Sequence, residues 1–301
     1  MKLSKRKLKY AAGAVIVLML SVITLYYLFK PKPAYYIDDN HYLHYPSQRG
    51  QVASSILATN ETENFTEQKI TFQSKDLSIF GLLFVPKNAV NLPAIIILPG
   101  GGVKKEDEAR IAKFAANRGF VAFTYDQRGI GETGGLFALL DYDFKSYMEG
   151  KEPVQHLAVY DALRAVDLVR QLPYVNKQKV ILAGESMGGR FSIIAAAIDP
   201  SISAEIVISS SGYGTPKAGD ESQQRFIDSI NPDHYISLIS PRPVFFLHGQ
   251  NDTTVPLQNA QYTYSLASQP KKFYYTENCG HGLCDRALPA FEDVLEILRN
   301  S

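Results

Sequence analysis

Apolar runs and amphipathic segments alternate along the chain from residue 69 onward. The runs Lys69–Ser74 and Ile79–Pro86 predict a β-hairpin, and Ala94–Leu98 is apolar on both faces, as in a strand buried in a parallel sheet. His156–Leu172 places its apolar residues at helical spacing. The pattern predicts further strands at 120–125, 179–184, 204–209, 243–249 and 271–276, and further helices at 106–118, 190–198, 257–267 and 287–299.

This alternation predicts a mostly parallel sheet with helices on both faces, joined by right-handed crossovers. Chemistry in such sheets gathers beyond the carboxyl ends of the strands. Residues 30–66 are polar and show no clear periodicity, so we interpret them as a stalk and lead-in to a domain at 67–301. With 301 residues, 46% of them hydrophobic and 20% charged, the chain is long and apolar enough to bury a core without disulfides.

The N-terminal segment carries no charge from Ala11 to Phe29. As a helix it spans about 28 Å, close to the hydrocarbon thickness of a bilayer. Basic residues cluster before it, so the positive-inside rule places residues 1–10 in the cytoplasm. We therefore expect a single-pass transmembrane signal anchor at 11–29, with the rest of the chain outside the cytoplasm. A cleaved signal peptide, which would release a secreted domain, is the main alternative, and a buried core helix is another; the bulky residues at the end of the segment disfavour cleavage.

Charge and cysteine content narrow the function further. Seven of the 31 Lys and Arg residues lie in residues 1–32, so the remaining 24 face 30 acidic residues. The chain after residue 32 therefore has a negative net charge and lacks the excess of basic residues that nucleic acid binding needs. Cys279 and Cys284 are the only cysteines and either pair in an oxidising compartment or stay as free thiols. A metal site there is only weakly indicated, because no second ligand pair has structural-zinc spacing.

The pentapeptide Gly184–Gly188, with the sequence GESMG, lies between a predicted strand and a predicted helix. A G-x-S-x-G pattern at such a junction forms a tight turn, whose glycines let neighbouring backbone pass close by. The turn raises the Ser186 hydroxyl above the sheet and points the N-terminus of the next helix at the same place. We predict that Ser186 is a nucleophile; a plain turn is the alternative.

A serine hydroxyl needs a base within hydrogen-bond reach. Of the six histidines, His281 lies in a glycine-flanked loop directly after the last predicted strand, and we predict that it is this base. His248 lies at the end of the predicted strand 243–249, before Gly249, and we interpret this histidine as a structural turn residue. Asp252 follows the strand at 243–249 and is predicted to orient the imidazole and stabilise its charged form. Alternatively, Asp252 caps the helix that begins near Pro256.

The oxyanion that forms in such a reaction needs two backbone N–H donors. The first is expected from Met187, the residue after the nucleophile. The second is expected from the loop after the first parallel strand, Leu98–Gly102, whose three glycines allow close approach to a substrate carbonyl. We assign Gly101, with Gly102 as the alternative; a loop that is merely flexible is the other interpretation.

Five segments, LPGGG, DQRGIGET, GESMGG, HGQNDTTVP and GHG, follow one another as in the α/β-hydrolase superfamily. The resemblance covers about residues 68–300 and looks closest to the dienelactone-hydrolase-like and prolyl-oligopeptidase-like branches. It implies an α/β-hydrolase fold, and the order serine, aspartate, histidine found here is the order of that superfamily. It also implies that Asp126 and Arg128 hold a loop near the cleft, with direct substrate binding as the alternative. Ser211–Ser240 is the only room for a cap, so we expect a small lid or none, and Phe137–Pro153 either lines the cleft or packs.

The sequence thus predicts a membrane-anchored serine hydrolase that cleaves an ester or related acyl bond through an acyl-enzyme. Its triad would be Ser186, Asp252 and His281, its oxyanion donors Gly101 and Met187. We expect no cofactor and no metal, a small-molecule acyl substrate, contact with a lipid bilayer through residues 11–29, and no nucleic acid partner. A peptidase or an acyltransferase would use the same triad. A catalytically silent binding protein on the same fold is the alternative from another class.

Overall fold

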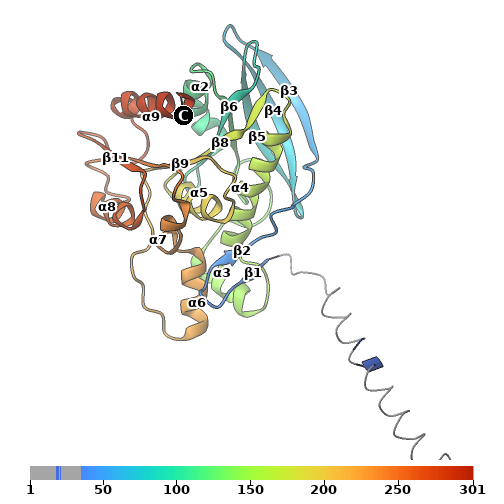
Figure 1. Ribbon diagram of the computed structural model, residues 1–301, viewed down its shortest axis with the longest axis vertical. Helices are drawn as coiled ribbons and strands as arrows, with labels where there is room; N and C mark the ends of the chain where they lie inside the picture. Colours follow the sequence, from blue (N-terminus) through green and yellow to red (C-terminus); the bar gives the residue numbers. More distant parts are fainter. Residues whose placement is uncertain (1–17, 20, 22–34, 301) are drawn as a thin grey trace, which may run out of the picture. The chain divides into compact units, whose positions relative to one another are not determined.

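The computed structural model describes residues 18, 19, 21 and 35–300 of the chain (Figure 1). The predicted cytoplasmic segment, residues 1–10, and nearly all of the predicted anchor, residues 11–29, lie outside the described residues. No helix among the described residues is long and apolar enough to cross a bilayer. The chain divides into two compact units, Met1–Tyr36 and Ile37–Ser301, and the second contains the predicted site residues.

A nine-stranded sheet forms the centre of the second unit, and a two-stranded sheet of β1 and β2 accompanies it. The strands of the described residues are β1 (Tyr36–Ile37), β2 (Leu43–His44), β3 (Ser54–Glu61), β4 (Phe65–Ser74), β5 (Leu77–Pro86), β6 (Leu92–Leu98), β7 (Val121–Tyr125), β8 (Val175–Glu185), β9 (Ala204–Ile208), β10 (Val244–Gly249) and β11 (Lys271–Thr276). The order in the large sheet is β11-β10-β9-β8-β6-β7-β5-β4-β3. The pairings β3–β4, β4–β5 and β5–β7 are antiparallel, and all pairings from β7 to β11 are parallel.

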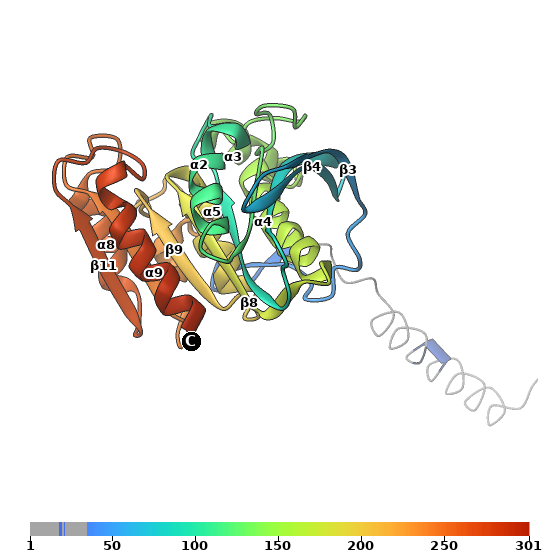
Figure 2. The same cartoon turned by 90° about the horizontal axis from the view of Figure 1, so that it is seen from above.

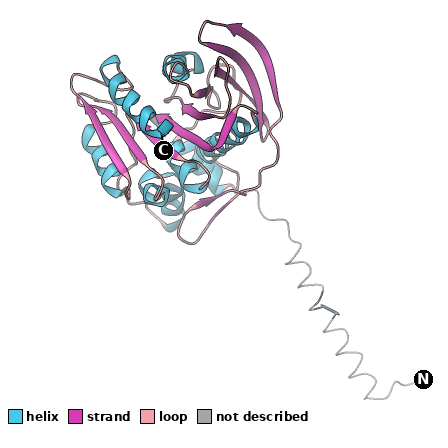
Figure 3. Ribbon diagram, turned by 45° about the horizontal axis from the view of Figure 1, so that its top comes forward, coloured by secondary structure: helices cyan, strands magenta, loops and turns pink. Residues whose placement is uncertain are grey.

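Helices cover both faces of this sheet, as Figures 2 and 3 show. They are α2 (Lys105–Ala116), α3 (Leu140–Met148), α4 (Val154–Gln171), α5 (Met187–Ile198), α6 (Glu221–Ile230), α7 (Pro232–Tyr235), α8 (Leu257–Leu266) and α9 (Leu288–Asn300), with short 3-10 turns η1 (Ile236–Ile239) and η2 (Asp285–Ala287). Helices α2 and α9 share one apolar cluster with the sheet. Helices α4, α5 and α8 pack on the other face. The predicted α/β-hydrolase arrangement, a mostly parallel sheet between helices, is confirmed.

The compact unit begins earlier than the predicted boundary at residue 67. Strand β3 pairs with β4 along the edge of the large sheet, and Leu43 and Val52 are buried. Arg49 forms ion pairs with Asp167 (2.9 Å) and Asp199 (2.6 Å). The interpretation of residues 30–66 as a stalk and lead-in is therefore wrong for residues 37–66, because buried side chains and ion pairs attach this segment to the domain.

The order of the central strands explains where a site can form. Strand β6 lies between β7 and β8, and the chain crosses from β6 to β7 through α2 and from β7 to β8 through α4 on the opposite face. The loops after β6 and β8 therefore lead to helices on opposite faces, α2 and α5, and the carboxyl ends of strands at such a position are where sheets of this kind bind ligands. Leu98, the last residue of β6, pairs with Gly184, two residues before Ser186.

The segment predicted as a small lid contains α6, α7 and η1. The aromatic residues of α3 pack against it: the rings of Phe144 and Tyr147 lie 5.6 and 5.5 Å from that of Phe226 in α6. Asp143 of α3 accepts a hydrogen bond from the Val154 N–H at 2.6 Å and so caps α4. Of the two interpretations of residues 137–153, lining the cleft or packing, Phe144 and Tyr147 follow the second.

Candidate active site

Ser186 is the single residue between β8 and α5, so strand turns into helix at this position. Its φ of 52° and ψ of −117° lie in a region that non-glycine residues rarely adopt, and such strain persists only where the surroundings hold it. Its N–H donates to the Ile208 carbonyl (2.9 Å), and its carbonyl accepts from the Gly189 N–H (3.1 Å) and the Ser210 hydroxyl (2.6 Å). The tight turn that the pentapeptide predicts is confirmed.

The glycine that ends the pentapeptide allows two backbone segments to touch. A Cβ atom on Gly188 would overlap the carbonyl oxygens of Leu98 and Pro99. The first turn of α5 therefore packs directly against the backbone that follows β6. This contact brings the predicted oxyanion loop to the nucleophile, and a Cβ on Gly100 would lie 3.5 Å from that of Ser186.

Asp252 and His281 are joined by a hydrogen bond of 2.8 Å between Oδ2 and Nδ1. The Asp252 side chain is fully buried, and its Oδ1 accepts from the N–H groups of Thr254 (2.9 Å) and Val255 (2.8 Å). These bonds fix the carboxylate in the loop after β10 and leave Nε2 of His281 for another partner. Within the described residues, the Ser186 hydroxyl makes no hydrogen bond to this ring, so the structure joins two of the three predicted triad residues directly.

His248 supports the loop that holds Asp252, as its interpretation as a structural residue implies. Its Nε2 lies 2.8 Å from the Val255 carbonyl and 3.5 Å from Oδ2 of Asp252. Burial lowers the pKa of His248, so the ring is neutral near pH 7. Because a carbonyl only accepts hydrogen bonds, Nε2 carries the ring proton.

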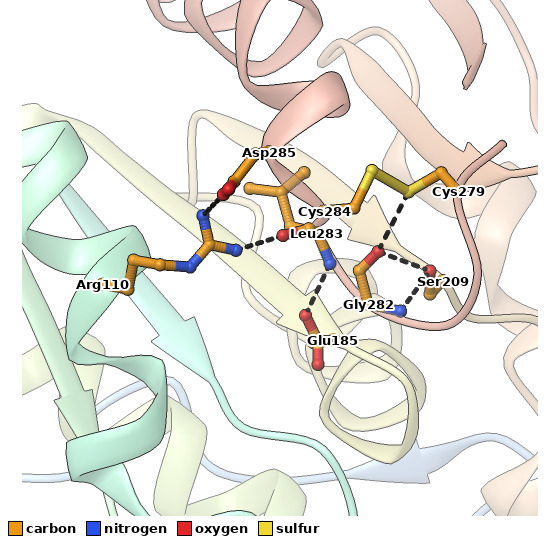
Figure 4. The surroundings of a disulfide bond; sticks show 8 residues. All are labelled: Arg110, Glu185, Ser209, Cys279, Gly282, Leu283, Cys284 and Asp285. Atoms are coloured by element: carbon orange, nitrogen blue, oxygen red, sulfur yellow. Dashed lines mark hydrogen bonds and ion pairs between the residues drawn. A yellow bond between two sulfur atoms is a disulfide. The ribbon is translucent and has the colours of Figure 1, made fainter. Parts of the chain in front are cut away.

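The loop that carries His281 is closed by a disulfide between Cys279 and Cys284 (Figure 4). Of the two states that the sequence leaves open for these cysteines, the paired one is present. The Cys279 carbonyl accepts from the Asn251 N–H at 2.9 Å, which ties the start of the loop to the segment that contains Asp252. The loop of His281 is therefore fastened to the loop of Asp252 at two points, the Cys279 carbonyl and the His281 side chain.

The end of the same loop is fastened beside the nucleophile. The Gly282 N–H donates to the Ser209 hydroxyl (3.0 Å), and the Leu283 N–H donates to a carboxylate oxygen of Glu185 (3.1 Å), as Figure 4 shows. Glu185 is the residue before Ser186, and Ser209 follows Ile208, whose carbonyl binds the Ser186 N–H. These contacts place the loop of the predicted base next to the turn of the predicted nucleophile.

The two predicted oxyanion donors lie close together. Met187 begins α5, and its Sδ lies 3.5 Å from the position of a Cβ on Gly101. Neither the Gly101 nor the Met187 N–H has an acceptor among the described residues, so both remain available to an oxygen of a substrate. Gly102, the alternative, has a φ of 76°, which favours glycine in the turn of this loop.

Two carboxyl groups to which the sequence analysis gave no role, one buried and one partly buried, line a cavity together with His281. Glu108 of α2 is 2% exposed, and its Oε1 has no hydrogen-bond partner in the described part of the chain. Burial, together with the negative charge of Glu185, raises the pKa of Glu108 to about 8. Burial also raises the pKa of Glu185. Glu185 belongs to the pentapeptide around Ser186, but no local pattern pairs it with Glu108, which lies far away in sequence.

Asp126 and Arg128 occupy structural positions, as the resemblance implies. Asp126 accepts hydrogen bonds from the backbone and the ammonium group of Lys105, both at 2.8 Å. Arg128 binds Asp161 through two parallel hydrogen bonds of 2.7 and 2.9 Å. Both side chains are buried and fully engaged, so they brace the loop after β7.

A cavity of about 450 Å³ adjoins the loop of Asp252 and the first turn of α5. Its lining is mostly polar and includes Ser211, Thr254 and Asn259. Arg190, one helical turn after Ser186, stacks on Tyr213 with its Cζ 4.4 Å from the ring centre. It makes no ion pair with a described carboxylate. The cavity therefore offers room and polar partners for a small molecule beside the predicted nucleophile.

Comparison with known proteins identifies related chains. The model of a family described as "Dienelactone hydrolase family" matches residues 79–286. The uncharacterized protein YfhR of Escherichia coli is 27% identical over 221 residues, which are 69% of this chain and 71% of that protein. The acetyl esterase Axe7A of Xylanibacter ruminicola is 24% identical over 66% of this chain and 51% of that protein. The solved structure of an acetyl xylan esterase from a Paenibacillus species superposes with a TM-score of 0.70 at 17% identity, covering 83% of this chain and 90% of that one.

Proposed function

The chain belongs to the dienelactone hydrolase family, and from this premise we propose that it is a serine hydrolase that cleaves a carboxylic ester. The observation that carries the proposal is the hydrogen bond between Asp252 and His281, held beside the strained turn at Ser186. Membership of the family and esterase relatives support an esterase-like hydrolase. The serine nucleophile and the acyl-enzyme go beyond family membership and are part of our proposal.

In the proposed reaction the Ser186 hydroxyl attacks the ester carbonyl while His281 takes its proton at Nε2. Asp252 orients the ring through Nδ1 and stabilises the imidazolium. The N–H groups of Met187 and Gly101 bind the developing oxyanion. His281 then gives its proton to the leaving alcohol. Water attacks the acyl-enzyme while His281 takes a proton from it, and His281 returns this proton to Ser186 as the carboxylic acid leaves. Hydrogen bonds between nucleophile and base are often long without substrate, which fits the unbonded Ser186 hydroxyl.

A short acyl group suits the cavity best. Burying a long alkyl chain against hydroxyl and guanidinium groups would leave those groups without hydrogen bonds, which costs free energy. Arg190 and Asn259 instead favour an acid or alcohol part that accepts or donates hydrogen bonds. The names of two relatives, an acetyl esterase and an acetyl xylan esterase, agree with a small acyl group.

Labelling with a fluorophosphonate probe tests the nucleophile. We expect the full chain to be labelled and to hydrolyse 4-nitrophenyl acetate, and Ser186→Ala to lose both properties. Ser265→Ala removes another serine hydroxyl, an exposed one on α8, and is expected to keep both. An unlabelled, folded wild type would show that the chain is a binding protein. A rate that rises from acetyl to palmitoyl esters would contradict the short acyl group.

We also propose that residues 11–29 anchor the protein in a membrane, with the hydrolase domain outside the cytoplasm. The support is the uncharged sequence of this segment and the basic residues before it. The full chain is expected to remain in membranes washed with alkaline carbonate, and its N-terminal sequence to begin before residue 11. Recovery of a soluble chain that begins after residue 29 would show that the segment is a cleaved signal peptide instead.

A further inference from the structure

A second cavity, of about 250 Å³, lies between α2 and the loop of His281. Glu108 and Arg110 of α2, Glu185 of β8 and His281 are among the residues that line it. The proposed reaction assigns no role to the two glutamates. Buried acidic groups next to a base are costly unless they have partners, so their arrangement requires a reason.

Glu185 links the nucleophile turn to the base loop. Its Oε2 accepts the Leu283 N–H at 3.1 Å, and both of its carboxylate oxygens lie 3.1 to 3.2 Å from the position of a Cβ on Gly282. Arg110 donates to the carbonyl of the same Leu283, so the backbone just after His281 is held from two sides. Figure 4 shows Glu185 and Arg110 reaching this segment from different elements.

The surroundings decide which member of the glutamate pair is ionised. Burial and the charge of Asp252 oppose the charged form of Glu185, whereas the Leu283 N–H, His281 and Arg110 favour it. Glu108 is more deeply buried and faces Asp107; the Gly100 N–H and Arg110 favour its charged form, but its Oε1 has no hydrogen-bond partner in the described part of the chain. The pKa values of both groups are raised, that of Glu108 to about 8, so near pH 7 the pair retains a proton, and Glu108 is the member that holds it.

We propose that Glu185 is a positioning residue for His281: its carboxylate holds the loop at Leu283 and places a negative charge beside the imidazole, in the cavity that both residues line. This rests on the proposed function only in taking His281 as the base. When His281 takes the Ser186 proton, the imidazolium then faces Glu185 as well as Asp252. Glu185 exchanges no proton itself; the proton passes from Ser186 to His281 and then to the leaving alcohol.

The proton affinity of His281 tests this directly and needs no substrate. The full chain in detergent micelles, with ring-labelled histidine, is titrated by NMR, and the His281 signal is assigned by its loss in His281→Asn. Glu185→Gln keeps a hydrogen-bond acceptor but removes the charge, and its proton-binding constant at His281 is expected to fall about tenfold. Glu108→Gln replaces a neutral carboxyl by a neutral amide of the same shape, so no change is expected.

A third variant separates charge from attachment. Glu185→Leu removes both the charge and the acceptor of the Leu283 N–H. For this variant we expect the lower proton affinity of His281 together with a lower unfolding temperature and a lower kcat on 4-nitrophenyl acetate. An unchanged His281 titration in a folded Glu185→Gln would reduce Glu185 to a structural link and overturn the proposal. A change in Glu108→Gln in place of Glu185→Gln would reverse the two roles and overturn it as well. If the wild type hydrolyses no ester and takes no fluorophosphonate, the proposed function fails, and the titration still decides the role of Glu185.

Discussion

The buried carboxyl of Glu108 makes the stability of the protein depend on pH, and Glu108→Gln is the change that reveals it. Burial and the charge of Glu185 raise the pKa of Glu108 from 4.5 to about 8. Between these values the folded chain retains a proton that the unfolded chain has lost. The stabilisation is therefore complete below pH 4.5 and is lost as the pH rises to about 8.

The size of the effect follows from the same two values. Each pKa unit corresponds to about 1.4 kcal/mol, so the difference amounts to at most about 5 kcal/mol of unfolding free energy. For a domain of this length that is on the order of 10 °C in the unfolding temperature. Glutamine carries no titratable proton, so Glu108→Gln is expected to escape this loss and to exceed the wild type in stability above pH 8.

Urea unfolding between pH 5 and 9.5 measures the unfolding free energy of the wild type and of Glu108→Gln. The wild type is expected to lose free energy steadily up to about pH 8, and the difference from Glu108→Gln to grow over the same interval. Glu296→Gln, which removes an exposed carboxyl from α9, serves as a control and is expected to follow the wild type. Parallel curves for the wild type and Glu108→Gln would refute the reasoning.

Three further changes test other parts of the structure. Asp252→Asn removes the charge that orients His281, and we expect kcat on 4-nitrophenyl acetate to fall on the order of a thousandfold or more, with the unfolding temperature little changed. Gly188→Ala places a methyl group where the carbonyl oxygens of Leu98 and Pro99 lie, so both activity and unfolding temperature are expected to fall, whereas Gly280→Ala meets no atom within 4 Å and leaves the unfolding temperature unchanged. Arg128→Met leaves the buried Asp161 without an ion-pair partner and with only the Ser74 hydroxyl as a hydrogen-bond donor, which is expected to cost about 3–5 kcal/mol of unfolding free energy in urea.

The sequence predicts the parts of the fold that depend on local patterns. The strand that ends at Leu98 and the turn at Ser186 are visible because apolar runs and glycine positions are local properties. Asp252 and His281 are found because each follows a strand whose carboxyl end lies at the same edge of the sheet. Hence the pairing of a residue at 252 with one at 281 is predictable without coordinates.

Other features depend on contacts that no local pattern shows. Strand β3 is exposed along its whole length, so it lacks the alternation of a half-buried strand, and only its pairing with β4 defines it. Nothing in the sequence distinguishes Arg49 from other polar residues, yet its side chain is buried and forms ion pairs with two aspartates. Glu108 and Glu185 meet only because α2 and the end of β8 flank one cavity. Such encounters follow from the assembled tertiary structure alone.

The ring that the disulfide closes around His281 has a consequence for how the protein matures. The chain has two cysteines, five positions apart, so oxidation within one molecule has a single product. No incorrect intramolecular pairing exists for an isomerase to repair. The cross-link can form as soon as this short stretch emerges into an oxidising environment, before distant parts of the sheet have met.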